Sequence, residues 1–190
     1  DKYQVPEPSG PGMRTRFIRS KEIEEEQLEA VMASSVDLFA CGIGAPPPAV
    51  EKAKELGKTT AALIGSPRHV RKTLASGVDM VVAQGAEAGA HTGTIGTFTL
   101  VPQIVDACGG LPVLAAGGVA TGRHVAASLA LGAQAVWAGT IWLTTTEHTA
   151  HMAPALVDKL LAASSADTVI TRSESGKTFR QIRSSWSDEW

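Results

Sequence analysis

The sequence predicts an α/β protein built on a parallel sheet covered by helices. Five short apolar segments alternate with helix-like segments at a spacing of about 20 to 30 residues. The strand segments are nearly uninterrupted apolar runs, as in strands buried on both faces. Three successive strands end in glycine-rich or Gly-Thr segments, and ligand sites in parallel sheets lie at such ends. Pattern alone fits both a closed barrel and an open, doubly wound sheet.

A loop and a helix are predicted before the first strand. Residues 1–19 contain three prolines and show no clear periodicity, which is typical of a loop. Residues 20–32 are predicted to be helical, because Ser20 can cap the helix and acidic residues crowd its first turns.

The five strand–helix units follow in order, each marked by helix start and stop signals. Gly57 stops the first helix, Ser66 and Pro67 begin the second, and Thr121 caps the fourth. Apolar residues recur at helical spacing within the helices. The strands are predicted at 36–41, 59–64, 78–83, 112–116 and 135–138, and the helices at 46–56, 67–77, 97–108, 121–131 and 148–162.

Composition narrows the possible partners. The net charge of -2 and the pI near 6.2 give no basic surface, so no nucleic-acid partner is expected. Cys41 and Cys108 are expected to be buried free thiols in a reducing compartment. No apolar run reaches the roughly 18 residues of a membrane helix, and residues 1–12 do not resemble a signal peptide. We therefore expect a cytoplasmic protein without a membrane partner.

The segment at 84–93 follows the third strand and ends in a histidine flanked by small residues. His91 could donate a hydrogen bond to an anionic ligand or act as a base, or it could simply bond to a neighbouring carbonyl. Glu87 could pair with His91 or be an ordinary loop carboxylate. The amide of Gln84 suits the polar edge of a heterocycle.

Two glycine-containing strand ends predict a phosphate site. Gly117 and Gly118 follow the fourth strand, and Gly139 with Thr140 follows the fifth. Backbone amides without side chains can approach a phosphate closely, although a single glycine pair could equally serve a tight turn. Two successive sites at one topological position favour phosphate binding.

No metal site is predicted. His148 and His151 are spaced to lie on one face of the last predicted helix, but no cysteine or carboxylate cluster accompanies them.

Several of these segments resemble the nitronate monooxygenase family, formerly called 2-nitropropane dioxygenases. The family loop reads approximately Gln-Gly-x-Glu-Ala-Gly-Gly-His-x-Gly, which residues 84–93 follow closely. The segments at 97–102, 115–123, 132–140 and 167–171 and the tail from Gly176 are also similar to the family, in order and at matching spacing.

The resemblance implies an FMN-dependent TIM (β/α)8 barrel, of which this chain forms the last five units, a partial barrel. Residues 1–35 would lead into the barrel, 36–165 would form its C-terminal part and 166–190 a tail. The substrates would be an alkyl nitronate or nitroalkane and O2, and a homo-oligomer is possible. His91 would be catalytic, and the FMN-binding residues would be Gln84, Gly89, Gly117, Gly118, Trp137, Ala138, Gly139 and Thr140.

Two residues depart from the family pattern. Ala90 replaces a glycine, so its methyl group restricts positive φ angles and narrows the approach to the flavin ring. Trp137 replaces a glutamine, so a side-chain amide contact is lost while the backbone amides remain.

Two rival functions fit the same residues. A flavin-dependent enoyl-acyl-carrier-protein reductase shares the barrel and the histidine loop but would need NAD(P)H. A barrel that binds a phosphate ligand without catalysis is the other rival, supported by the departures at Ala90 and Trp137.

Overall fold

The computed structural model describes residues 21–42, 44–173 and 176–189 of the 190-residue chain. The predictions for the loop at 1–19 and for the Ser20 cap lie outside these residues.

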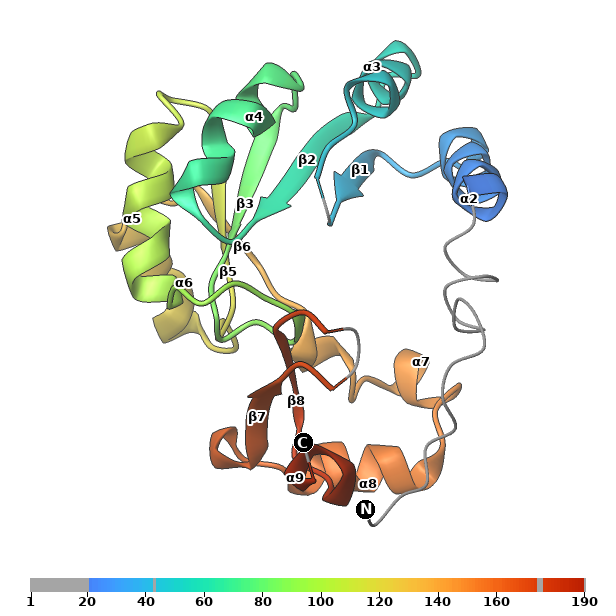
Figure 1. Cartoon of the computed structure of the whole chain (residues 1–190), viewed down its shortest axis with the longest axis vertical. Coiled ribbons are helices and arrows are strands. Elements are labelled where there is room, and N and C mark those ends of the chain that lie inside the picture. Colours follow the sequence, from blue (N-terminus) through green and yellow to red (C-terminus); the bar gives the residue numbers. More distant parts are fainter. Residues whose placement is uncertain (1–20, 43, 174–175, 190) are drawn as a thin grey trace.

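A five-stranded parallel sheet forms the main body of the chain. Its strand order is β1-β2-β3-β5-β6, and every neighbouring pair is parallel. The sheet curves, and helices cover its outer side (Figure 1). The strands are β1 (Leu38–Cys41), β2 (Thr59–Ile64), β3 (Met80–Gln84), β5 (Val113–Ala116) and β6 (Ala135–Trp137). The predicted α/β fold with five parallel strands is therefore confirmed.

The helices that precede and connect these strands match the predicted ones closely. They are α2 (Lys21–Ala33), α3 (Pro47–Glu55), the 3-10 turn η1 (Pro67–His69) with α4 (Val70–Ala75), α5 (Thr97–Ala107) and α6 (Gly122–Ala130). Thr121 caps α6 as predicted, and the ring nitrogen Nδ1 of His124 accepts the backbone N–H of Thr121 in return. This reciprocal arrangement satisfies N–H groups that a helix start leaves free.

Alternate strand residues face the two sides of the sheet. One set packs under the helices with Leu100, Val101 and Ile104 of α5, and these three side chains are fully buried. The other set forms a smaller cluster on the opposite face, around Ala61, Val82 and Ala116. Burial on both faces explains why the strands are almost continuously apolar.

The predicted helix at 148–162 is wrong in its first part. The structure has two helices here, α7 (Thr146–Thr149) and α8 (Pro154–Ala162). Pro154 has no backbone N–H, and a residue before proline disfavours helical angles; Ala153 accordingly has φ -62° and ψ 130°. His151 thus lies in the turn after α7, outside the helix that it was predicted to share with His148.

A second, antiparallel sheet was not predicted. It has the order β4-β8-β7 and crosses the end of the main sheet where the strands terminate (Figure 1). Its strands are β4 (Ala90–His91), β7 (Thr168–Thr171) and β8 (Phe179–Ile182). Segment 84–93, predicted as a loop, thus contains a short strand held by the tail. The remaining elements are η2 (Thr140–Trp142), η3 (Ser165–Asp167) and α9 (Ser185–Asp188).

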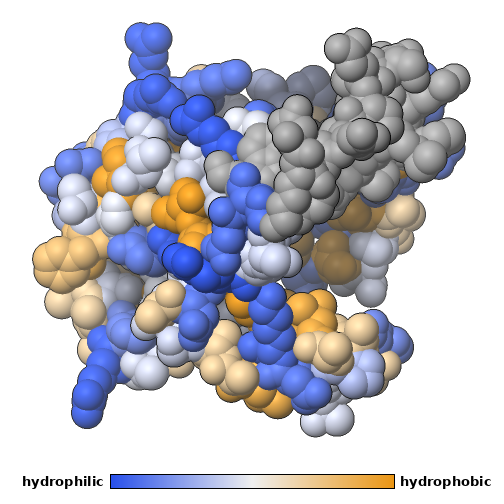
Figure 2. Space-filling view, turned by 60° about the horizontal axis from the view of Figure 1, so that its bottom comes forward, coloured by the Kyte–Doolittle hydropathy of each residue, from blue (hydrophilic) through white to orange (hydrophobic). Residues whose placement is uncertain are grey.

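The two cysteines are buried and free, as expected, and burial raises the pKa of both thiols. On the face shown in Figure 2, hydrophilic residues separate several patches of hydrophobic ones. None of the helices in the described part of the chain is long and apolar enough to cross a membrane.

Candidate active site

The carboxyl ends of three neighbouring strands lie level at one edge of the main sheet. Gln84 at the end of β3 pairs with Ala116 of β5, which pairs in turn with Trp137 of β6. The loops that follow these residues therefore start side by side. All the residues predicted to bind cofactor or substrate belong to these three strand ends and their loops.

Gly85 lies against the first turn of α5. A Cβ atom at Gly85 would lie 2.5 Å from both the Cα and the backbone N of Thr97. No side chain fits there, so the position requires glycine. The Thr97 hydroxyl lies 2.8 Å from Oε2 of Glu87 and 2.9 Å from the carbonyl O of Gly117, and either oxygen can accept its proton. Thr97 thus joins the loops after β3 and β5 to the start of α5.

The carboxylate of Glu87 stabilises this loop and does not pair with His91. Its Oε2 also accepts the backbone N–H of Thr97, at 2.8 Å. Burial works to raise the pKa of Glu87, but the two hydrogen bonds from Thr97 and the nearby charge of Arg180 outweigh it, so the pKa is lowered. The start of α5 also favours a negative charge. Of the two predicted roles, these contacts match the loop carboxylate.

Ala90 adopts a conformation that normally belongs to glycine. Its φ is +63°, the one positive value outside glycine among the described residues. The left-handed region costs an L-residue roughly 1 kcal/mol or more. Pairing with Arg180 in β8 holds the backbone there. The methyl group predicted to restrict positive φ angles therefore strains this position but does not change its conformation.

His91 is held by contacts on its backbone and its ring. It pairs with Phe179 across β4 and β8, and the two rings meet edge to face with centroids 5.1 Å apart. The side-chain amide of Gln84 donates to the carbonyl O of His91 at 3.3 Å. The next residue, Thr92, donates its N–H to Thr178 at 3.1 Å. These contacts set the orientation of the imidazole. His91 is half-buried, so part of it stays accessible.

Arg180 fastens the tail to the loop after β3. Its Nε donates to the carbonyl O of Ala86 at 2.9 Å, and its Nη1 donates to Oγ1 of Thr168 at 2.8 Å. The guanidinium thus connects the loop that carries His91 to both strands of the tail hairpin.

Gly117 and Gly118 both have positive φ angles, of 101° and 72°. A Cβ atom at Gly117 would lie 3.0 Å from the N of Ala88 and 3.1 Å from the carbonyl O of Gly85. Packing against the loop after β3 therefore already requires glycine at this position. Gly118 has more room, since a Cβ atom there would meet only the side chain of Glu87, 3.3 Å away.

The turn after β6 is more open. A Cβ atom at Gly139 would have nothing within 4 Å, and Gly139 and Thr140 are both exposed. A Cβ atom at Gly89 would lie 3.7 Å from Oγ1 of Thr140, so the loops after β3 and β6 are neighbours. Ala138 accepts a hydrogen bond from the indole Nε1 of Trp142 at 2.9 Å.

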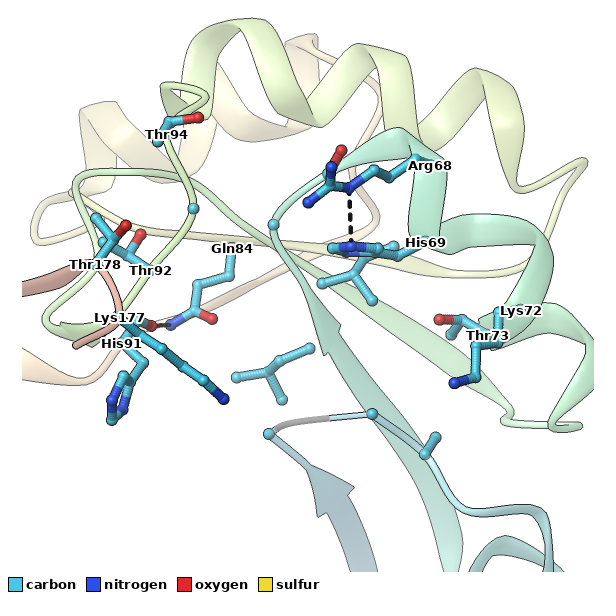
Figure 3. A pocket seen from close by; sticks show the side chains of 18 residues that line it. Arg68, His69, Lys72, Thr73, Gln84, His91, Thr92, Thr94, Lys177 and Thr178 are labelled. Carbon is cyan, nitrogen blue, oxygen red and sulfur yellow. Dashed lines mark hydrogen bonds between the residues drawn. The ribbon is translucent and has the colours of Figure 1, made fainter. Parts of the chain in front are cut away.

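A cavity of about 530 Å³ lies beside His91 at the ends of β2 and β3 (Figure 3). Gln84 and His91 line it, while the other predicted site residues do not. The predicted residues therefore form two neighbouring groups. The first lines the cavity, and the second consists of Gly89, Gly117, Gly118, Trp137, Ala138, Gly139 and Thr140 along the adjacent strand ends.

Three basic side chains in this cavity were not predicted as site residues, and His69, which the sequence suggests is a surface group, lines it with them. Arg68, His69 and Lys72 come from η1 and α4, and Lys177 comes from the tail. The charge run at residues 68–72 was visible in the sequence. Only the fold, however, places this charge run at the cavity that contains His91, across from Lys177, which comes more than a hundred positions later in the sequence.

Comparisons with known proteins show the family to which the chain belongs. A family model of nitronate monooxygenase matches residues 13–190. The chain belongs to the nitronate monooxygenase family. Among curated relatives, the protein Rv1533 of Mycobacterium tuberculosis, which is named as a monooxygenase, is 51% identical over 164 residues. That match covers 86% of this chain and 43% of the relative. A probable nitronate monooxygenase of Staphylococcus aureus strain JH9 is 36% identical over 187 residues, covering 89% of this chain and 51% of the relative.

Solved structures of the TIM-barrel type match the fold. Nitroalkane oxidase from Streptomyces ansochromogenes superposes with a TM-score of 0.79 at 29% identity, covering 88% of this chain and 51% of that one. FabK from Thermotoga maritima also gives 0.79, at 32% identity, covering 87% and 52%. The chain thus spans about half the length of the relatives that it matches.

Proposed function

We propose that this chain supplies the phosphate-binding and substrate-facing part of an FMN-dependent enzyme that oxidises alkyl nitronates with O2. The observation that carries the proposal is the placement of His91, half-buried beside a 530 Å³ cavity and next to a row of glycine-containing strand ends. Membership of the nitronate monooxygenase family supports it.

The second group of site residues fits a flavin phosphate. Gly118, Gly139 and Thr140 offer exposed backbone and a hydroxyl at the ends of adjacent strands, and the space beside Gly139 is open. Phosphate sites in barrels of this type lie at the last strand ends and use such neutral donors. Gly117 contributes through packing, since contacts within the chain already require glycine there. Gly89, Trp137 and Ala138 would border the same cofactor.

The first group fits the reacting end. Bound FMN would supply the electron transfer and the reaction with O2. His91 would stabilise the negative charge of a nitronate or accept the proton next to a nitro group. Gln84 holds the backbone of His91 through its side-chain amide, and its position at the cavity wall lets it contact the flavin edge.

The visible absorption spectrum of the purified full-length protein tests the cofactor, and oxygen uptake with propionate 3-nitronate tests the reaction. We expect a flavin spectrum and oxygen consumption that depends on the nitronate. A protein that stays colourless after FMN is added would contradict the proposal and would favour the non-catalytic phosphate-binding barrel.

A second candidate is a flavin-dependent enoyl-acyl-carrier-protein reductase. The match to FabK, equal in TM-score to the match with nitroalkane oxidase, favours it. Rapid bleaching of the flavin by NADPH, in the absence of any nitronate, would distinguish this activity from nitronate oxidation.

A further inference from the structure

The cavity beside His91 is bordered by cationic side chains from two sides, from η1 with α4 and from the tail, and we call these side chains together the cationic wall. Of its 18 lining residues, three carry a positive charge, namely Arg68, Lys72 and Lys177, and none is an aspartate or glutamate. Figure 3 shows Lys72 and Lys177 pointing into the cavity from opposite sides, one from α4 and the other from the tail. Within the described part of the chain, neither ammonium group has a carboxylate partner. Like charges gathered around one hollow favour an anion there.

Arg68 makes one side-chain hydrogen bond within this wall. Its Nε donates to Nε2 of His69 at 3.2 Å, so that imidazole nitrogen is an acceptor. Among the described residues, the terminal nitrogens of Arg68 make no hydrogen bond and are available to a ligand. The hydroxyl-bearing residues Ser66 and Thr73 line the same wall.

We infer that this wall is a second binding site, for the phosphate group of a small phosphorylated molecule. A carboxylate carries one charge and two oxygens, which one arginine can satisfy. A phosphate ester carries nearly two negative charges and three terminal oxygens. Two ammonium groups and a guanidinium match the charge and the donor demand of the phosphate.

This site is separate from the proposed flavin phosphate site. The cationic wall belongs to η1, α4 and the tail, whereas the glycine site belongs to the ends of β5 and β6. The two share no lining residue among those described. Because the cavity continues from the cationic wall to His91, one ligand can place its phosphate at the wall and its reactive end at the imidazole.

Calorimetric titration of the full-length, flavin-loaded protein with inorganic phosphate at constant ionic strength tests the site. We expect saturable binding, and we expect Lys72→Met and Lys177→Met each to raise the Kd about tenfold, the effect of losing one charge-assisted contact. Lys52→Met is the matched control, because Lys52 is exposed on α3 and outside the cavity, and its Kd should not change. No saturable binding, or an equal Kd in all four proteins, would overturn the inference.

The flavin content of the same variants separates the two phosphate sites. Lys72→Met and Lys177→Met should keep the wild-type ratio of FMN to protein. If these variants lose bound FMN to the same extent as they lose affinity for inorganic phosphate, the cationic wall is the flavin phosphate site and the inference is wrong. The titration requires no turnover, so it stands or fails independently of nitronate oxidation.

Two probes identify the source of the phosphate. Adenosine 2′-phosphate stands for a nicotinamide dinucleotide, and 3-nitropropyl phosphate stands for a phosphorylated substrate. We expect one of them to displace inorganic phosphate from the wild-type protein and to do so more weakly from Lys72→Met. Failure of both to displace it would contradict a site for phosphate esters.

Discussion

The loop after β3 and the turn after β6 are both predicted to contain site residues, but the two are built differently. The loop after β3 is fixed at every turn: Gly85 packs on α5, Glu87 holds Thr97, and His91 pairs with the tail. The turn after β6 is open, with nothing near Gly139 and exposed positions at Gly139 and Thr140. This contrast indicates that the first loop is built to position a side chain, while the second is built to leave room for a ligand.

The largest difference is expected between two Gly→Ala substitutions. Gly85→Ala places a methyl group against the backbone of Thr97, so we expect a loss of at least about 2 kcal/mol in the free energy of unfolding. Gly139→Ala adds the same methyl group in open space, at a negative φ of -118°, and should change stability by less than about 0.5 kcal/mol. Urea denaturation measures both, and equal losses would remove the contrast between the loops.

The next effect concerns the tail contact of His91. Phe179→Leu keeps an apolar side chain in β8 but removes the edge-to-face contact with the imidazole. We expect kcat for nitronate oxidation to fall several-fold, with flavin content unchanged, because the ring loses its fixed orientation. Trp186→Leu is the control, an aromatic residue of the same tail that does not line the cavity. An equal fall in both variants would show that only tail stability matters.

A smaller effect is expected at Ala90. Ala90→Gly relieves the positive φ angle and should raise the free energy of unfolding by about 0.5 to 1 kcal/mol, after the greater flexibility of glycine in the unfolded chain is subtracted. Ala135→Gly in β6, where φ is not positive, should lower it by a similar amount. A destabilised Ala90→Gly variant would mean that the methyl group makes favourable contacts that outweigh the strain.

The smallest effect is the pH dependence at Glu87. Its pKa is lower in the folded chain than in the unfolded one, so its contribution to stability is complete above the unfolded pKa and is lost as pH falls through the folded value. Glu87→Gln should therefore cost about 1 kcal/mol or less at pH 7, since the group is exposed, and the difference should shrink below about pH 4.3. A wild-type–variant difference that stays constant from pH 7 to pH 3 would contradict this assignment. Unfolding midpoints across this range measure it.

The sequence was sufficient for the parts of the fold that depend on local pattern. All five strands of the main sheet were predicted, because each is an apolar run closed by glycine or a turn. The helix predicted at 148–162 is interrupted because Pro154 begins a new helix, although the apolar spacing continues across the break. Segments 36–165 and 166–190 remain a predicted division of the chain.

The tail sheet and the cavity could not be predicted in the same way. The pairing of β4 with β8 and the bond from Arg180 to Ala86 join residues about ninety positions apart, and no local periodicity records such contacts. The same is true of Lys177 and Lys72, which are far apart in the sequence and point into the cavity from opposite sides. Within the site, the sequence predicted Gln84 and His91, but it did not show that Phe179 contacts His91 or that Arg180 holds the loop that carries it.

Replacement of His91 tests the central claim most directly. In the full-length, FMN-loaded protein, His91→Asn should lower kcat/KM for oxygen consumption with propionate 3-nitronate by about a hundredfold or more, with the flavin spectrum unchanged. His124→Asn, which alters a helix cap away from the cavity, should keep the wild-type value. Wild-type turnover in flavin-loaded His91→Asn would show that the loop after β3 does not present a catalytic histidine.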